Sequence, residues 1–130
     1  MAAPGNVSVQ WFGLRELVAR LQSSIPKTQK AAATALYREA NRIMARSIPI
    51  TPKDTGNLRA SGHVDLPVLT ASGSEVRFGY GGAAAPYAVY VHEVPAYHKP
   101  PTRWKFLEQP VLEAQAGLAK RLAADMNLGL

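Results

Sequence analysis

The chain has 130 residues, 47% of them hydrophobic, with 15 Lys and Arg against nine Asp and Glu, and no Cys. The lack of cysteine excludes disulfides, thiolate metal sites and a cysteine nucleophile, and the sequence has no run of about 18 apolar residues that would predict a transmembrane helix. The length fits a single domain, 1–130, and the net charge of +6 favours contact with DNA, RNA or an acidic protein surface.

The hydrophobic content is rich in alanine, and the large aromatic residues are few: three Phe, two Trp and five Tyr. Alanine contributes little apolar area, so a thin core is expected, of the kind that neighbouring subunits often complete. The N-terminal segment MAAPGNVSVQWFG has no basic start followed by an apolar stretch, so we do not expect it to be a signal peptide.

Two helices are expected in the first third of the chain. Residues 1–25 form an extension in which an amphipathic helix is predicted over about 8–23, from apolar residues at helical spacing: Trp11, Leu14, Leu17, Val18 and Leu21. Pro26 suits the first turn of a second helix, predicted over about 26–47 and ended by the segment Ile48-Pro49-Ile50-Thr51-Pro52.

The second predicted helix has two different faces. Its apolar face carries Ala33, Leu36, Ala40, Ile43 and Ser47. The other face carries a basic stripe four residues apart, Arg38, Arg42 and Arg46. Glu39 interleaves with the stripe and aromatic residues are scarce there, so we interpret it as a solvated face, with DNA or an acidic neighbouring subunit as alternatives.

The segment TPKDTGNLRAS follows this helix. Asp54 and Thr55 can each accept a backbone N–H and cap a short helical turn over 56–59, with Leu58 pointing inward and Arg59 outward. The segment contains no nucleophile or base with a partner. It therefore predicts a structural corner between helix and strand, made of Thr51, Pro52, Asp54, Thr55, Gly56, Leu58 and Arg59.

The middle of the chain predicts a β-hairpin around the turn TASGS. Its two arms have apolar residues in alternation, namely Val64, Leu66 and Val68, then Val76 and Phe78. Pro67 places the first arm at an edge or a bulge. After it we expect a flexible loop (GYGGAAAP), a third extended segment (YAVYVHEV) and a proline-rich surface loop (PAYHKPPTRW).

The last predicted helix runs over about 109–127, with Pro110 as its first residue. Its expected buried face is made of Leu112, Ala116, Ala119, Ala123 and Met126, widened by Val111, Leu118 and Leu122. The whole order predicts an α+β domain with N-terminal helices, a small antiparallel sheet built on a β-hairpin, and a C-terminal helix.

Enzymatic motifs were tested and none fits. A zinc protease of the HExxH type needs its second His one helical turn after the first, but His92-Glu93 is followed by Pro95 and by His98 six residues on. His63 is the only histidine left as a third ligand. We therefore interpret His92 and Glu93 as the exposed end of a strand. The segment GYGGAAAP lacks the spacing of phosphate-binding loops, so no catalytic, metal or cofactor site is expected.

Taken in order, the motifs resemble the tail-completion or neck proteins of long-tailed bacteriophages, over roughly residues 26–126. The resemblance is carried by Thr51-Pro52, Asp54-Thr55-Gly56, Leu58-Arg59, Phe78-Gly79, Tyr87-Ala88, Tyr90-Val91, Glu93 and Phe106-Leu107. The chain departs from the pattern at His92, which precedes the glutamate, and in the segment VPAYHKPPTRW, which lacks the usual Gly-Thr pair.

The resemblance implies a structural virion protein of the head–tail junction, made in the host cytoplasm, that forms a ring and joins the head connector to the tail tube. A hexamer is expected, with a dodecamer as the alternative. The implied partners are further copies of the chain, a head-completion or connector protein, and a tail terminator or tail tube protein. At most nonspecific contact with DNA in the lumen is expected, with no membrane, no cofactor and no enzymatic turnover.

On this interpretation the glycine and proline loops contact neighbouring proteins. The expected interface residues are Tyr80, Gly81, Gly82, Tyr97, His98, Lys99, Arg103 and Trp104, followed by Arg38, Arg42 and Arg46. Trp104 is either an interface anchor or an aromatic tucked beside Phe106 under the last helix. The alternatives are a tail terminator or other neck ring, a small basic DNA-binding protein, and a metal hydrolase using His92, Glu93 and His98.

Overall fold

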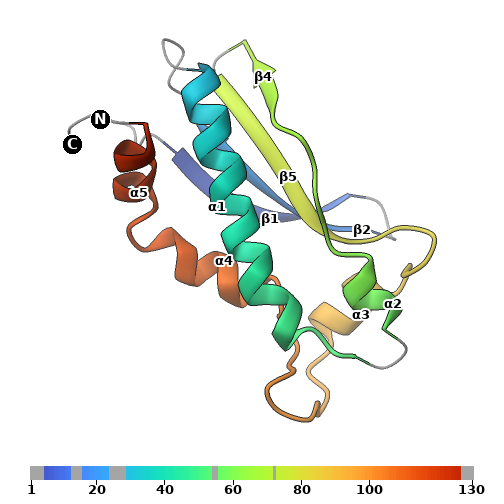
Figure 1. Ribbon diagram of the computed structural model, residues 1–130. Helices are drawn as coiled ribbons and strands as arrows, with labels where there is room; N and C mark the ends of the chain where they lie inside the picture. Colours follow the sequence, from blue (N-terminus) through green and yellow to red (C-terminus); the bar gives the residue numbers. More distant parts are fainter. Residues whose placement is uncertain (1–4, 13–15, 24–28, 54–55, 72, 127–130) are drawn as a thin grey trace.

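The computed structural model of the protein describes residues 5–12, 16–23, 29–53, 56–71 and 73–126. Its elements follow the order β1 Gly5–Phe12, β2 Glu16–Ser23, α1 Gln29–Ile50, α2 Asn57–Ala60, β3 His63–Val64, β4 Val68–Thr70, β5 Gly73–Gly81, α3 Ala88–Glu93, α4 Glu108–Gln115 and α5 Leu118–Asp125 (Figure 1). Helices and an antiparallel sheet are segregated, so the predicted α+β class is confirmed.

The sheet has the strand order β1-β2-β5-β3, with every pair antiparallel, and β4 pairs with another part of β5. Because β3 and β4 both pair with β5, the predicted hairpin is confirmed. Pro67 lies in the gap between β3 and β4, as expected of a residue that has no N–H to donate to the ladder. Of the alternating apolar residues of the first arm, Val64 is half-buried, whereas Leu66 and Val68 are exposed.

One face of the sheet forms the core. Inward residues of β2 and β5 lie opposite each other and are buried: Leu17 with Tyr80, Ala19 with Phe78, and Leu21 with Val76. Helix α1 packs against β5 and β2, while α4 and α5 pack against α1 and β1 (Figure 1). Between them, these helices cover the apolar face of the sheet.

The opposite face of the sheet is polar. The Glu75 carboxylate accepts hydrogen bonds from Arg20 at 3.4 Å, Gln22 at 3.2 Å and Arg77 at 3.0 Å. Alternation along β2 and β5 therefore separates a core face from a hydrogen-bonded face, as a half-buried antiparallel sheet requires.

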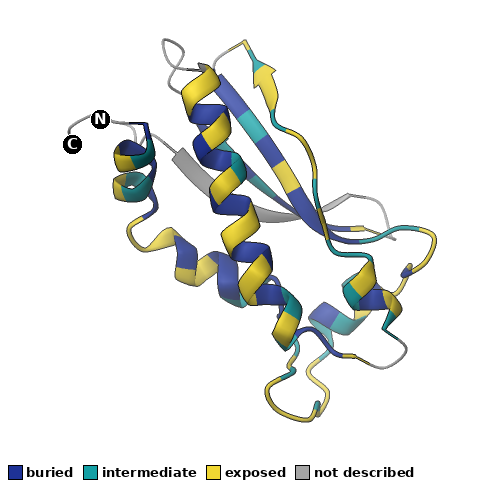
Figure 2. Cartoon of the chain, viewed as in Figure 1, coloured by how far each residue is buried: buried dark blue, intermediate teal, exposed yellow. Residues whose placement is uncertain are grey.

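Helix α1 follows its predicted pattern closely. Its apolar face, including Ser47, is buried, and Arg38, Arg42 and Arg46 are exposed (Figure 2). The helix continues to Ile50, three residues beyond the predicted end, with Pro49 in its last turn.

The predicted helix over 8–23 is wrong, because the region forms strands β1 and β2. Leu17 and Leu21 are four residues apart, a separation that keeps two side chains on one face in a helix and in a strand alike. The buried Ala19 between them, paired with Phe78 of β5, belongs to the strand period of two. Trp11 lies in β1, paired with Leu17, and Leu14 lies outside the described residues.

The predicted extended segment YAVYVHEV is also wrong, because its centre forms helix α3. Ala88 and His92 are buried while Tyr90 between them is 68% exposed. A strand would have placed all three side chains on one face. His92 is consequently in the core, and the expectation that it lies at an exposed strand end is wrong.

The last predicted helix divides in two at Gly117, whose φ of 75° lies in the left-handed region that glycine adopts without strain. The break changes which side chains face inward. Leu112 and Ala116 are exposed, against the prediction, while Val111, Leu118, Leu122, Ala123 and Met126 are buried. The first helical residue is Glu108, with Pro110 in the first turn.

Candidate functional site

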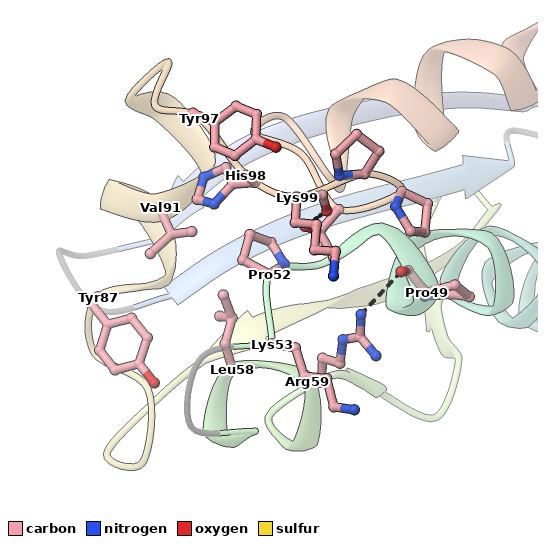
Figure 3. Close-up of a pocket in the computed structure, with 13 residues that line it drawn as sticks. Pro49, Pro52, Lys53, Leu58, Arg59, Tyr87, Val91, Tyr97, His98 and Lys99 are labelled. Atoms are coloured by element: carbon pink, nitrogen blue, oxygen red, sulfur yellow. Dashed lines mark hydrogen bonds between the residues drawn. The ribbon is translucent and has the colours of Figure 1, made fainter.

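A groove of about 850 Å³ opens at the end of the molecule where α1 ends (Figure 3). The corner after α1 contributes Pro49, Pro52, Lys53, Leu58 and Arg59. Residues 97–102 of the proline-rich loop line another side, and α3 with its N-cap contributes Tyr87 and Val91. The corner after α1 and residues 87–102, which the sequence separates by tens of residues, therefore meet around one space.

The corner is built on Thr51 and Pro52, both buried, and on the short helix α2. Gly56, with φ 82°, occupies the N-cap position of α2, and Leu58 points inward with 3% exposure, as predicted. The predicted capping residues Asp54 and Thr55 lie outside the described residues. The expected short helical turn over 56–59 corresponds to α2, which lies between α1 and β3.

Arg59 folds back onto the end of α1, so the expectation that it points outward is wrong. Its Nε donates to the carbonyl oxygen of Thr51 at 2.8 Å, and its Nη2 donates to that of Pro49 at 3.1 Å (Figure 3). The last turn of α1 has no basic residue of its own. Arg59 therefore supplies both hydrogen bonds and positive charge to the negative end of the helix dipole.

Replacing Arg59 with methionine is expected to lower the free energy of unfolding by about 2 kcal/mol, because two charge-assisted hydrogen bonds to helix-end carbonyls are lost. Urea denaturation followed by circular dichroism measures the change. The matched control is Arg38→Met, which removes an exposed arginine from α1 and is expected to change stability by less than about 0.5 kcal/mol. Equal losses in the two variants would show that Arg59 does not hold the corner.

Three buried hydroxyl groups tie the corner to the sheet. Ser47 Oγ donates to the carbonyl of Phe106 at 2.7 Å and lies 2.7 Å from Tyr80 Oη, which lies 3.0 Å from Thr51 Oγ1. Burial raises the pKa of Tyr80, against the lowering effect of these hydrogen bonds. Tyr80 is fully buried, so its predicted role as a partner-contact residue is wrong.

A second polar cluster holds α3 against α4. The buried His92 has Nδ1 2.5 Å from Glu93 Oε2, and its Nε2 accepts from the backbone N–H of Glu108 at 3.0 Å. Nε2 is thus the unprotonated nitrogen and Nδ1–H the donor. Lys105 Nζ completes the cluster, 2.8 Å from Glu93 and 3.4 Å from Glu108.

Burial lowers the pKa of His92, although its contact with Glu93 works in the opposite direction. The pKa of Glu93 is also lowered, since hydrogen bonds from Lys105 and His92 together outweigh the upward effect of burial. In both cases the folded protein binds its proton less readily than the unfolded chain does. The stabilisation that these two groups contribute is therefore present at neutral pH and is lost as the pH falls.

We expect the free energy of unfolding to decrease as the pH is lowered from 7 toward 5, because unfolded His92 takes up a proton from about pH 6.5 downward, whereas folded His92, whose pKa is lowered, takes it up less readily. Denaturation curves across this range measure the slope. The His92→Gln variant, whose side chain does not titrate, should show a flatter profile over the same range. An unchanged slope in the variant would contradict this origin.

The proline-rich loop has a fixed base and an exposed tip. At the base, Arg103 N–H donates to the carbonyl of Ile50 at 2.9 Å, and Lys105 N–H donates to that of His92 at 2.9 Å. Tyr97 at the tip is 85% exposed. The prediction of a surface loop is confirmed, and its base bonds fix one wall of the groove.

The other predicted interface residues are scattered. Trp104 is half-buried with the Lys105 ammonium 5.6 Å from its ring centre, and Arg103 is exposed. Gly81 and Gly82 lie at the end of β5 and do not line the groove. Arg38 and Arg46 are exposed on α1, while Arg42 is engaged with Glu39 at 2.9 Å and Asp125 at 3.7 Å. The structure thus brings together the corner and residues 97–102, and leaves the arginine stripe on a separate face.

The groove is positively charged. Lys53, Arg59 and Lys99 border it, and its lining includes no Asp or Glu within the described residues. Over that same part of the chain, no three His, Asp or Glu side chains lie close enough to hold a metal ion. None of the described helices is long and apolar enough to cross a bilayer. The groove offers apolar contact and positive charge, which suits binding.

The sequence did not indicate the contacts that support the groove. Ser47 was assigned correctly to the buried face of α1, but the partners of its hydroxyl are Tyr80 of β5 and the carbonyl of Phe106, which precedes α4. The burial of Glu39 could have been predicted from its spacing, because it lies three residues after Leu36 and four before Ile43, both on the apolar face of α1.

Comparison with known proteins adds no relative: no family model, curated protein or solved structure matches this chain. The relation to phage neck proteins therefore stays a prediction from the motifs.

Proposed function

We propose that this protein is a ring-forming subunit of the neck of a long-tailed bacteriophage, where it joins the head connector to the tail tube. The observation that carries the proposal is the convergence of the motif residues. Pro52, Leu58, Arg59, Tyr87 and Val91 come from separate motifs of the neck-protein pattern and border one groove. The motifs thus build a shared surface at one end of the molecule.

The structure of this end of the molecule suits a surface that binds another protein. Arg59, the buried hydroxyl groups and the His92 cluster fix its framework, whereas the loop tip at Tyr97 projects into solvent. A fixed framework lowers the ordering cost of an interface, and exposed aromatic side chains are frequent anchors in one. In this proposal the protein works by binding, without turnover, as a hexamer or a dodecamer.

A DNA-binding role is the second candidate, favoured by the net charge of +6 and by the exposed Arg38 and Arg46 on α1. It predicts duplex affinity that falls steeply with salt concentration, because phosphate contacts release counterions. The neck role predicts weak, nonspecific DNA contact. Filter binding of duplex DNA over a range of salt concentrations separates the two.

The neck role is tested by electron microscopy of a lysate from a phage whose copy of this gene carries an early stop codon. Full heads beside separate, finished tails are the expected result, and expression of the intact gene in trans should restore joined particles. Unfinished tails of irregular length would instead assign the chain to tail termination. Normal, joined virions would overturn the proposal.

A further inference from the structure

The groove at the end of α1 combines positively charged side chains with flat apolar surfaces. Neither Lys53 nor Lys99 has an ion-pair partner among the described residues, although both are exposed beside the groove. Proline rings, the Tyr97 ring and the side chain of Val91 line the same groove (Figure 3). Positive charge beside such a surface is complementary to a ligand that carries both carboxylates and an apolar side chain.

We propose that this groove binds a short, extended, acidic segment of a second protein, one that carries at least one large apolar side chain. Lys53 and Lys99 pair with its carboxylates, and Tyr97 packs against the apolar side chain. Arg59 adds a fixed positive charge, because its guanidinium is already held by the carbonyls of Pro49 and Thr51. This inference rests on the proposed function only for the origin of the segment, which is an adjacent ring of the neck.

The size of the groove and its supports fit such a segment. A volume of about 850 Å³ lies within the range of clefts that hold compact ligands, and is enough for a few residues of an extended chain. The wall formed by residues 97–102 is held at its base by the Arg103 hydrogen bond to the end of α1. In addition, His98 lines the groove, and its Nε2 is shielded from solvent without a hydrogen-bond partner among the described residues.

The occupant is expected to come from a different protein, because this chain has no acidic segment to offer. No two of its nine acidic residues lie closer in sequence than Glu108 and Glu113. The net charge of +6 also makes an acidic partner a better match for this positively charged groove than a second copy of the chain. A nucleic acid fits less well, since the apolar surfaces of Leu58, Val91 and the prolines give nothing to a phosphate backbone.

The test is fluorescence anisotropy with a fluorescein-labelled peptide, Asp-Glu-Phe-Asp-Glu-Leu-Asp, compared with the same peptide carrying amides, Asn-Gln-Phe-Asn-Gln-Leu-Asn. The groove variant combines Lys53→Glu with Lys99→Glu. The matched control combines Arg38→Glu with Arg46→Glu, which changes the net charge equally on exposed positions of α1. We expect tighter binding of the acidic peptide, about tenfold or more loss in the groove variant, and less than about twofold loss in the control.

A third variant, Tyr97→Ser, should weaken both peptides, because it removes apolar contact without changing charge. Equal losses in the two charge-reversal variants would overturn the inference, since net charge alone would then explain the binding. Equal affinity of the protein for the two peptides would also overturn the inference. So would a groove variant that loses duplex DNA binding but keeps its peptide binding.

Complementation of the stop-codon phage separates this inference from the proposed function. If the groove variant restores joined virions as well as the control does and no peptide discriminates between them, the groove inference is overturned while the neck role holds. If the peptide binds as expected but the stop-codon lysate contains normal virions, the neck role is overturned while the groove remains a peptide site.

Discussion

Replacement of Phe106 by alanine is expected to lower the free energy of unfolding by about 4 kcal/mol, the largest loss we expect from a single side chain in this protein. The Phe106 ring is fully buried and lies edge-on to both Tyr80 and His92, with centroid distances of 5.1 Å in each case. It therefore joins the sheet, the His92 cluster and the start of α4. Removing it leaves a cavity where these three parts meet.

Urea denaturation followed by circular dichroism measures this loss, and Leu112→Ala is the matched control. Leu112 lies on α4 but is 52% exposed, so its truncation is expected to cost less than about 1 kcal/mol. Should the alanine variant fail to fold, Phe106→Leu keeps most of the apolar volume and is expected to lose much less. A loss from Phe106→Ala no greater than that from Leu112→Ala would contradict the packing described.

Replacement of Glu39 by alanine is expected to lower the free energy of unfolding by about 2 kcal/mol, because it leaves the partly exposed Arg121 and Arg42 without the buried carboxylate that they share. The Glu39 side chain is 3% exposed; its Oε1 accepts from Arg121 Nε at 3.0 Å and Nη2 at 2.6 Å, and its Oε2 accepts from Arg42 at 2.9 Å. Arg121 also donates to the carbonyl of Ala116, just beyond the end of α4. One carboxylate thus fixes α5 and the end of α4 on α1.

A double-mutant cycle tests whether the loss arises from an unpaired charge. Glu39→Met combined with Arg121→Met removes both partners, and its cost should be clearly smaller than the sum of the two single changes. Glu113→Ala, which removes an exposed carboxylate from α4, is the control and should be almost neutral. Additive losses in the double variant would contradict a direct interaction between Glu39 and Arg121.

The parts of the fold that could be predicted are those in which apolar residues recur with one clear spacing over a long segment. Helix α1 repeats its apolar residues over several turns, and the hairpin around β5 has turn residues on a strand pattern. The error over 8–23 occurred because the pattern depended on residues four apart, such as Leu17 and Leu21, and this spacing fits both periods. The segment YAVYVHEV was assigned to a strand although its buried residues, Ala88 and His92, are also four apart. The break at Gly117 was missed for a different reason, since a single glycine within a helical pattern is often tolerated.

The groove could not be predicted from the sequence, for a physical reason. The corner around Thr51 and the loop around Tyr97 were each predicted as separate segments. No local sequence pattern indicates that they lie side by side in the fold. Their meeting depends on Arg103 bonding to the end of α1 and on His92 bonding to the start of α4, which are contacts between distant parts of the chain. For the same reason Tyr80 looked like the start of an exposed loop, although its hydroxyl lies in the core.

We propose that this chain forms a neck ring whose groove end faces an adjacent ring. This proposal is tested most directly by a cryo-electron microscopy reconstruction of the neck in a phage that carries this gene. We predict a ring of copies between the head connector and the tail tube, with the groove bordered by Lys53 and Lys99 in contact with a segment of a neighbouring protein. A neck without this chain, or a ring whose grooves all face solvent, would contradict the account.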